Sequence, residues 1–185
     1  MTGFVKAVLG ITLLLGGSLV ASEAAFGATT PANGAIKVWV TPSITGSGGT
    51  VVITGVVGDY GKTVNANASG KPQKKGGYEL LVMKKGNILV NGQQFNKVTN
   101  NAQPTDFSVT SCSGSVVASA PAPIVSGTKA YSGITGSVTL TATFAFVGPF
   151  YTSGSKKGQC NTSNSAPNPP GFFATITGTG TVTFG

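Results

Sequence analysis

The sequence contains no histidine and no arginine, and it has few acidic side chains. All 12 of its basic residues are lysines, and only four of its 185 residues are acidic. Without histidine, a Ser-His or Cys-His nucleophile cannot be assembled. Without arginine, no guanidinium group can clamp a transferring phosphate or read guanine in a bidentate manner. We therefore expect neither a triad hydrolase nor a phosphoryl transferase, and we expect no nucleic-acid partner.

The composition also gives little support to metal or cofactor chemistry. The two cysteines have no histidine and few carboxylates beside them, so they cannot complete the four-ligand shell of a zinc site. No glycine-rich segment precedes a helical pattern, which excludes a Rossmann or P-loop nucleotide site. We expect no metal and no cofactor.

Residues 1–27 have the organisation of a secretory signal peptide. Lys6 precedes an uncharged apolar run over 7–22, and small residues follow as far as Ala25. That run has 16 residues, several of them glycine, whereas a spanning helix needs about 20. We therefore favour cleavage over retention as a membrane anchor. Residues 28–185 are then one secreted domain, with no stable membrane insertion after cleavage.

The two cysteines are expected to form a disulfide. In an exported chain two cysteines most simply pair with each other. A Cys112–Cys160 bond would close a loop of 49 residues, which is worth about 4 kcal/mol in the chain-entropy model.

Apolar residues recur with period two, which is typical of half-buried strands. The pattern is clear in Ser137–Val147, and in Ala174–Phe184 five threonines share one face. No stretch of the mature chain reads as a long amphipathic helix. The sequence predicts an all-β fold, an antiparallel up-and-down barrel of about eight strands, with a β-sandwich as the alternative. The other expected strands are 35–41, 50–57, 77–84, 87–95, 105–117 and 122–126, and the expected long loops are 65–76, 91–104 and 159–171.

Glu79 is the candidate catalytic residue among the few carboxylates. Asp59 and Asp106 occupy ordinary positions, in the turn 58–61 and near a strand start. Glu79 instead lies within an expected strand whose two faces are both apolar, so its direction is ambiguous. We favour the outward direction, which makes it a surface acid. If it points inward, it is a buried carboxylate with a raised pKa and a candidate acid or base.

One segment resembles a hallmark of the allene oxide cyclase and dirigent β-barrel superfamily. The hallmark reads Gly-Thr-Gly, then an aromatic residue, then Gly-x-x-Gly leading into a strand. The segment 125–137 matches it over about 20 of 185 residues when the following strand is included, with Lys129 where the second glycine is usual. The matching residues are Gly127, Thr128, Tyr131, Gly133 and Gly136. The turn 58–61 and the closing stretch 176–180 are also similar to secreted bacterial proteins of this type.

The resemblance implies a barrel with an apolar cavity that moulds the shape of a ligand. It carries over no catalytic residue. Gly178 and Gly180, on the expected inner face, would leave room in the lumen. The leading hypothesis is a secreted barrel, not an enzyme, that binds a small apolar or amphipathic molecule in this lumen. Tyr78, Phe144 and Phe146 are the expected ligand contacts.

Two alternatives belong to other functional classes. The first is a cyclase-like or isomerase-like enzyme of the allene oxide cyclase barrel type, with Glu79 in the cavity. The second is a cell-surface module that makes weak contacts with anionic wall material through lysines, or binds sugars through amide-rich loops. Its expected aromatic contacts are Trp39, Tyr60, Tyr78 and Phe95. The lysine pairs at 74–75 and 84–85 lie at opposite ends of one expected strand, so they cannot form one patch.

Overall fold

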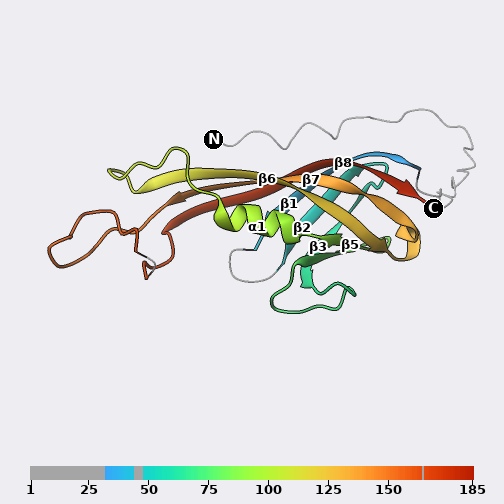
Figure 1. The fold of residues 1–185 in the computed structure, drawn as a ribbon, viewed down its shortest axis with the longest axis horizontal. Coiled ribbons are helices and arrows are strands. Elements are labelled where there is room, and N and C mark those ends of the chain that lie inside the picture. Colours follow the sequence, from blue (N-terminus) through green and yellow to red (C-terminus); the bar gives the residue numbers. More distant parts are fainter. Residues whose placement is uncertain (1–31, 44–47, 164) are drawn as a thin grey trace, which may run out of the picture.

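Eight antiparallel strands close into a single barrel in chain order, and the last strand returns to pair with the first. The computed structural model describes residues 32–43, 48–163 and 165–185 (Figure 1). The predicted up-and-down barrel is thus confirmed, and the sandwich alternative is wrong. The predicted signal peptide lies outside the described residues. The elements are β1 (Gly34–Pro42), β2 (Gly49–Gly55), β3 (Asp59–Ala66), β4 (Tyr78–Met83), β5 (Asn87–Asn91), α1 (Gln93–Asn101), β6 (Ser113–Gly127), η1 (Lys129–Tyr131), β7 (Ile134–Val147) and β8 (Gly171–Phe184).

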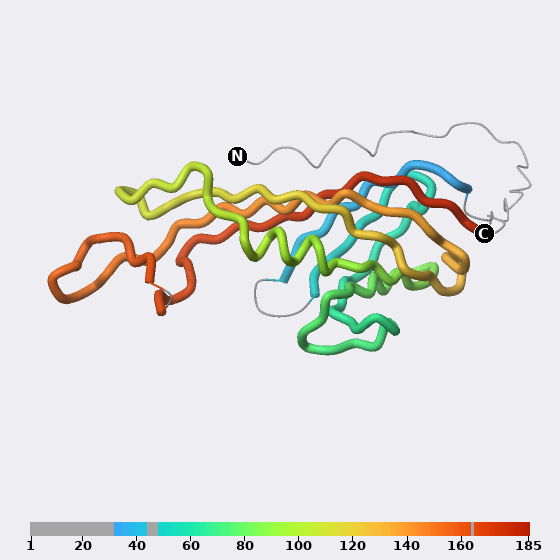
Figure 2. The backbone as a smooth tube through the Cα atoms, in the orientation of Figure 1, coloured from blue at the N-terminus to red at the C-terminus, as the bar shows by residue number. Residues whose placement is uncertain are grey.

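The three strands β6, β7 and β8 are much longer than the other five. They have 15, 14 and 14 residues, whereas β1 to β5 have between five and nine. The long strands run the length of the molecule and continue past the barrel as a three-stranded extension, with the connection 148–170 at its tip (Figures 1 and 2). The molecule therefore has a barrel at one end and an open sheet at the other.

Inward-facing side chains alternate with outward-facing ones along the barrel strands, as the pleat requires. On β1, for example, Ile36 and Val38 are buried while Lys37 and Trp39 are exposed. The principal core is a cluster of 15 buried residues contributed by β1, β2, β4–β8 and neighbouring turns. Burial of this apolar surface is the main source of stability of the barrel.

Two strands differ from those expected. No strand was expected over β3, whose ends were assigned to the turn 58–61 and to the loop 65–76, because the sequence Asp-Tyr-Gly-Lys-Thr-Val-Asn-Ala has no apolar face. In contrast, β6 is one strand where two were expected. Pro121 and Pro123 interrupt its pattern, but β5 pairs only with the end of β6 from Ile124 onward. The prolines therefore lie along an edge at which no further strand needs their missing N–H group.

Helix α1 lies where a polar loop was expected. The segment is rich in asparagine and glutamine, which are typical of loops, but it forms a short helix that contacts β6 and buries one side chain, Phe95. Phe95 packs against Ala120 and Ala142, at the start of the extension. This apolar contact, rather than the helix propensity of the segment, accounts for the helix.

The predicted disulfide is confirmed. Cys112 and Cys160 are bonded, with their Cα atoms 5.1 Å apart. The bond joins the segment that precedes β6 to the long β7–β8 connection. A disulfide of this kind is compatible with an extracellular protein.

Candidate functional site

A cavity of about 260 Å³ lies inside the barrel. The barrel end that carries the turns 55–59, 83–87 and 127–134 is called the closed end, and the opposite end is called the open end. The cavity extends from the central core to the open end, where it borders the β1–β2 loop and α1. Most of its wall is aliphatic, provided by Ile36, Val38, Val40, Ile53, Leu81, Ile88, Val90, Ile124, Val138, Leu140 and Ile176.

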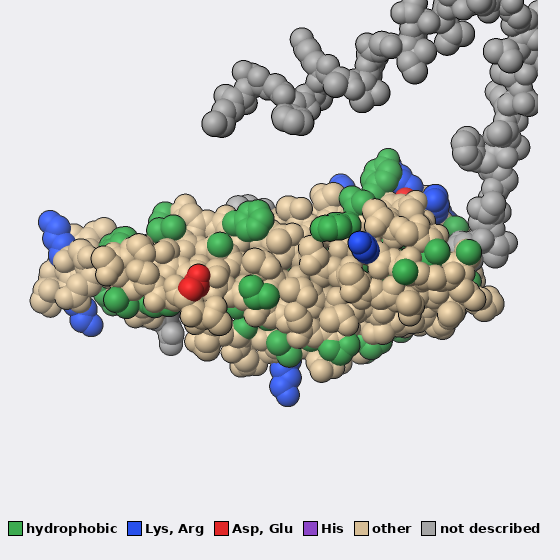
Figure 3. Space-filling view, turned by 90° about the horizontal axis from the view of Figure 1, so that it is seen from above, with side chains coloured by type: hydrophobic (Ala, Val, Ile, Leu, Met, Phe, Trp, Pro, Cys, Tyr) green, Lys and Arg blue, Asp and Glu red, His purple; other side chains and the backbone are tan. Residues whose placement is uncertain are grey.

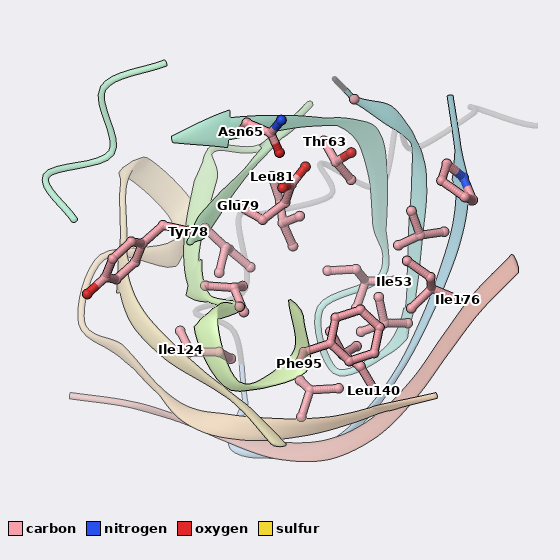
Figure 4. Close-up of a pocket in the computed structure, with 18 of the residues that line it drawn as sticks. Ile53, Thr63, Asn65, Tyr78, Glu79, Leu81, Phe95, Ile124, Leu140 and Ile176 are labelled. Carbon is pink, nitrogen blue, oxygen red and sulfur yellow. The ribbon is translucent and has the colours of Figure 1, made fainter. Parts of the chain in front are cut away.

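The polar part of the wall comes from β3 and β4. Thr63, Asn65 and Glu79 gather on one side of the cavity, and Phe95, Leu140 and Ile176 lie on the other side (Figure 4). Asn65 and Glu79 are directly opposite each other in the β3–β4 register, so their side chains share the inner face. The cavity thus combines a polar side with an apolar body.

Glu79 points into the barrel, so the favoured outward direction was wrong. Its strand places Leu81 and Met83 on the same inner face, and both are buried. Burial raises the pKa of Glu79, and a hydrogen bond with the side chain of Thr63 offsets part of that rise. The structure therefore provides a carboxyl group in a largely apolar cavity, which is the environment that the inward interpretation required.

Helix α1 forms one edge of the open end. Phe95 and Asn96 line the cavity, as does Gly92, the residue that precedes the helix. The Asn91 side chain accepts a hydrogen bond from the Gln93 N–H at 3.0 Å, which fixes the turn into the helix. The position of α1 is thus set by β5, whose end it follows, and by the apolar contact of Phe95 with the extension.

The structure places the three predicted ligand contacts differently from one another. Tyr78 borders the cavity, but its ring points away from the other lining side chains (Figure 4). Phe144 packs against Phe172 on the extension, with the ring centroids 6.1 Å apart. Phe146 stacks with Phe107 at 6.3 Å. Neither Phe144 nor Phe146 lines the cavity.

The space expected beside the inner-face glycines is only partly available. Gly178 is buried, and a Cβ atom there would lie 2.7 Å from both Leu140 Cδ2 and Val138 Cγ1. The space that a side chain would occupy at Gly178 is therefore filled by Val138 and Leu140, which approach the β8 backbone. The cavity lies farther along the barrel, at Ile176.

A second polar group, formed by Tyr131 and Asp59, fills the closed end of the barrel. Tyr131 is 1 % exposed, and its hydroxyl donates a 2.6 Å hydrogen bond to Asp59 Oδ2. The same carboxylate accepts hydrogen bonds from the backbone N–H groups of Lys85 at 2.9 Å and Tyr60 at 2.8 Å. These three donors satisfy Asp59 within the protein. Asp59 lies in the turn 58–61 and Tyr131 in the segment 125–137, so this hydrogen bond joins two segments far apart in the sequence.

The polar side of the cavity was not predicted because the inner face of β3 is polar rather than apolar. Its inward positions are Asp59, Gly61, Thr63 and Asn65, whereas Tyr60 and Lys62 face outward. The side chains alternate between the two faces, but the inward positions are polar or glycine and the outward positions include Lys62. No apolar face marks this strand, so its polar inner face is seen only once its place in the barrel is known.

Comparisons with known proteins leave the site to be interpreted from its own geometry. Neither protein-family models, nor curated proteins, nor solved structures match this chain. Within residues 32–43, 48–163 and 165–185, no group of three or more potential metal-ligating side chains lies together. The helices in this part of the chain are too short or too polar to cross a membrane.

Proposed function

We propose that the barrel lumen binds a small, mainly apolar molecule that carries one hydrogen-bond donor. The observation that carries this proposal is the cavity of about 260 Å³ with an aliphatic wall and one carboxylate, Glu79. A dry apolar cavity of about 150 Å³ in another protein binds benzene, so scaling by volume suggests a ligand of about ten non-hydrogen atoms. Ligand sites of this kind are typically apolar, with a few polar groups that fix orientation.

The polar side of the cavity determines which head group fits. An alcohol or phenol can donate a hydrogen bond to Glu79 and accept one from the amide of Asn65, which lies opposite Glu79 in the strand register. A pure hydrocarbon gives Glu79 no additional partner, although displacing water from the aliphatic wall still favours its binding. A carboxylate ligand would place a second negative charge beside Glu79 in a medium of low dielectric constant, which is unfavourable.

A second candidate function is an acid–base step on the bound molecule. The inward direction of Glu79 and its raised pKa favour this candidate, because a carboxyl group that titrates closer to neutrality is a better proton carrier. This is the cyclase-like or isomerase-like alternative. If it is correct, Glu79→Gln abolishes turnover of any identified substrate while the substrate still binds. Unchanged turnover in that variant would eliminate the alternative.

Three bicyclic ligands with the same ten-carbon ring system test the binding proposal. Naphthalene has no polar group, 2-naphthol adds a hydroxyl group, and 2-naphthoate adds a carboxylate. Titration calorimetry is expected to rank their affinities in the order 2-naphthol, naphthalene, 2-naphthoate. Native mass spectrometry of the secreted protein complements this panel by showing any ligand retained through purification. Failure of all three to bind would contradict the proposal.

The Glu79→Gln variant is expected to change the ligand preference rather than abolish binding. Removal of the negative charge should strengthen 2-naphthoate binding at least tenfold, because the charge repulsion is lost. It should weaken 2-naphthol binding about fivefold, since a hydrogen bond to a neutral acceptor is weaker than one to an ionised acceptor. Naphthalene affinity should stay within about twofold and serves as the internal control. In the wild type, naphthoate binding should strengthen as the pH falls toward the raised pKa of Glu79, and this dependence should be absent from the variant.

Filling the cavity should weaken binding of every ligand. Ile176 lines the cavity and is partly buried, so Ile176→Phe places a larger side chain in the ligand volume. We expect at least a tenfold loss of 2-naphthol affinity in a variant that still gives the circular dichroism spectrum of the wild type. Thr179→Phe adds the same side chain to the exposed face of the same strand and should bind normally. Equal affinities of the two variants would place the binding site elsewhere.

A further inference from the structure

Three exposed apolar side chains form a continuous row on the outer wall of the barrel. The strand register sets Trp39 of β1 opposite Val52 of β2, and Val52 opposite Tyr60 of β3. Their exposed fractions are 49 %, 41 % and 56 %. Neighbouring strands are about 4.8 Å apart, so the row spans about 10 Å across the wall. Such exposure of large apolar side chains in one row differs from a random scatter of single residues.

Lysines flank this row on three sides. Lys37 lies two residues before Trp39 on β1, and Lys62 lies two residues after Tyr60 on β3, both with exposed side chains. The Lys84 ammonium group lies over the Tyr60 ring, 5.7 Å from its centroid. The row Trp39–Val52–Tyr60 together with these three lysines is called the outer patch. Figure 3 shows lysine and hydrophobic side chains gathered over the barrel on the face seen there, at the right of the view.

The outer patch has no carboxylate of its own, and the fold is the reason. Asp59 is buried at the closed end, Glu79 points into the cavity, and Asp106 lies beside Ser115 at the extension. These are the acidic residues of the part of the chain that the structure describes. The Asp59 carboxylate adjoins Tyr60, but it is hydrogen-bonded to Tyr131 and to backbone N–H groups. The three lysines of the outer patch outnumber this one nearby carboxylate, so the net field favours an anionic partner.

The surroundings of the outer patch identify the kind of anion. Threonines of the outer face adjoin the row, because Trp39 pairs with Thr177, Lys37 with Thr54 and Thr179, and Lys62 with Thr50. Proteins that bind a lipid surface typically present a continuous apolar face to it. Aromatic faces separated by hydroxyl groups and ammonium groups instead suit sugar rings, which present C–H groups for packing and hydroxyl groups for hydrogen bonding.

We propose that the outer patch binds an acidic polysaccharide, with sugar rings stacked on Trp39 and Tyr60 and the sugar carboxylates held by Lys37, Lys62 and Lys84. This surface is separate from the cavity, since the row faces away from the lumen. The outer patch is not formed by the lysine pairs that the sequence places at turn tips. Its lysines are two single residues on different strands, Lys37 and Lys62, and one member of the pair 84–85.

The single tryptophan of the chain provides the readout, because Trp39 belongs to the outer patch. Titration with polygalacturonate is expected to change the Trp39 fluorescence in a saturable manner, with an affinity that falls steeply as salt is added. Neutral dextran should cause no such change at the same sugar concentration. The 2-naphthol affinity of the cavity should be unaffected by polygalacturonate, so failure at one site can be distinguished from failure at the other.

Two triple variants with equal loss of charge decide whether the outer patch is responsible. The first variant changes Lys37, Lys62 and Lys84 to Gln, and it should weaken polygalacturonate binding at least tenfold and reduce its salt dependence. The second variant changes Lys71, Lys74 and Lys75 to Gln. It removes the same charge from the exposed β3–β4 loop and should bind within about twofold of the wild type. Trp39→Ala, followed by calorimetry, should also weaken binding, and Trp39→Phe should restore most of it.

Three results would overturn the proposal. Equal losses in the two triple variants would mean that net charge alone attracts the polymer. Equal binding of dextran would mean that the lysines have no role in recognition. The third result is one-sided competition, in which vesicles of anionic phospholipid displace polygalacturonate but the polymer does not displace the vesicles at any concentration. This result would assign the outer patch to a membrane surface.

Discussion

Replacing Cys112 and Cys160 together with alanine is expected to lower the free energy of unfolding by about 4 kcal/mol. The bond joins positions 48 residues apart in sequence. In the chain-entropy model, its loss lets the unfolded chain explore the conformations that the closed loop forbids. Few other substitutions in this protein are expected to cost as much.

The position of the disulfide separates this stability effect from any effect on binding. The bond lies at the tip of the extension, where the Gly148 N–H donates to the Cys112 carbonyl and Phe150 bridges to Cys160. Neither cysteine lines the cavity. The double variant should therefore bind 2-naphthol with nearly wild-type affinity wherever it is folded.

Urea denaturation, followed by circular dichroism, measures the effect. The wild type treated with a reductant provides the control, because it should lose the same free energy without any change of sequence. A loss below about 1 kcal/mol in both samples would show that the 112–160 loop is already restricted in the unfolded chain.

The Asp59→Ala variant is expected to lose about 3 kcal/mol. Asp59 is 7 % exposed, and its carboxylate accepts hydrogen bonds from the Tyr131 hydroxyl and from two backbone N–H groups, those of Lys85 and Tyr60. Removal of this acceptor leaves three donors at the closed end without their partner, and buried unsatisfied donors are costly. Tyr131→Phe removes only one of the donors and should cost about half as much.

The pH dependence of stability follows from the pKa shifts of the same pair. Burial alone would raise the pKa of Asp59, but the bonds from Tyr131, Lys85 and Tyr60 bring it below its ordinary value. A lowered carboxyl pKa contributes stability above about pH 4, and this contribution is lost as the pH falls through the folded-state value. Burial, then the bond and the charge of Asp59, raise the pKa of Tyr131. That contribution is present below about pH 10 and is lost as the pH rises through the folded-state value.

Urea titrations at several pH values test both statements. Wild-type stability should decline at the two extremes, and Asp59→Ala should show a flatter profile. Asp106→Ala is the matched control, since that carboxylate also accepts hydrogen bonds, from Ser115, and also has a lowered pKa, but it is solvent-exposed. If Asp59→Ala and Asp106→Ala were equally stable, the closed-end network would contribute nothing.

Local pattern accounts for the parts of the fold that were predicted correctly. β7 and β8 were recognisable because each is long and has one apolar face over most of its length. The disulfide followed from the presence of two cysteines in a chain with a predicted export signal. The all-β class followed from the number of strands and the absence of long helical patterns, which left the barrel and the sandwich both open. These inferences need only the periodicity and composition of neighbouring residues.

The candidate site could not be predicted in the same way. Glu79 is flanked by apolar residues on both sides, so its direction depends on the register of β4 between β3 and β5. Phe95 lies in a polar segment, and its burial depends on β6 and β7, which come later in the chain. The predicted aromatic contacts Phe144 and Phe146 have the correct period but lie beyond the barrel, on the extension.

An all-β chain of about eight antiparallel strands with one disulfide followed from the sequence, because alternation and composition are local properties. The pairing of β8 with β1 that closes the barrel, the direction of the carboxylates, the polar inner face of β3 and the lysines around Trp39 are known only from the tertiary structure. Each of these depends on register, and a shift of one residue would turn every side chain of a strand to the opposite face.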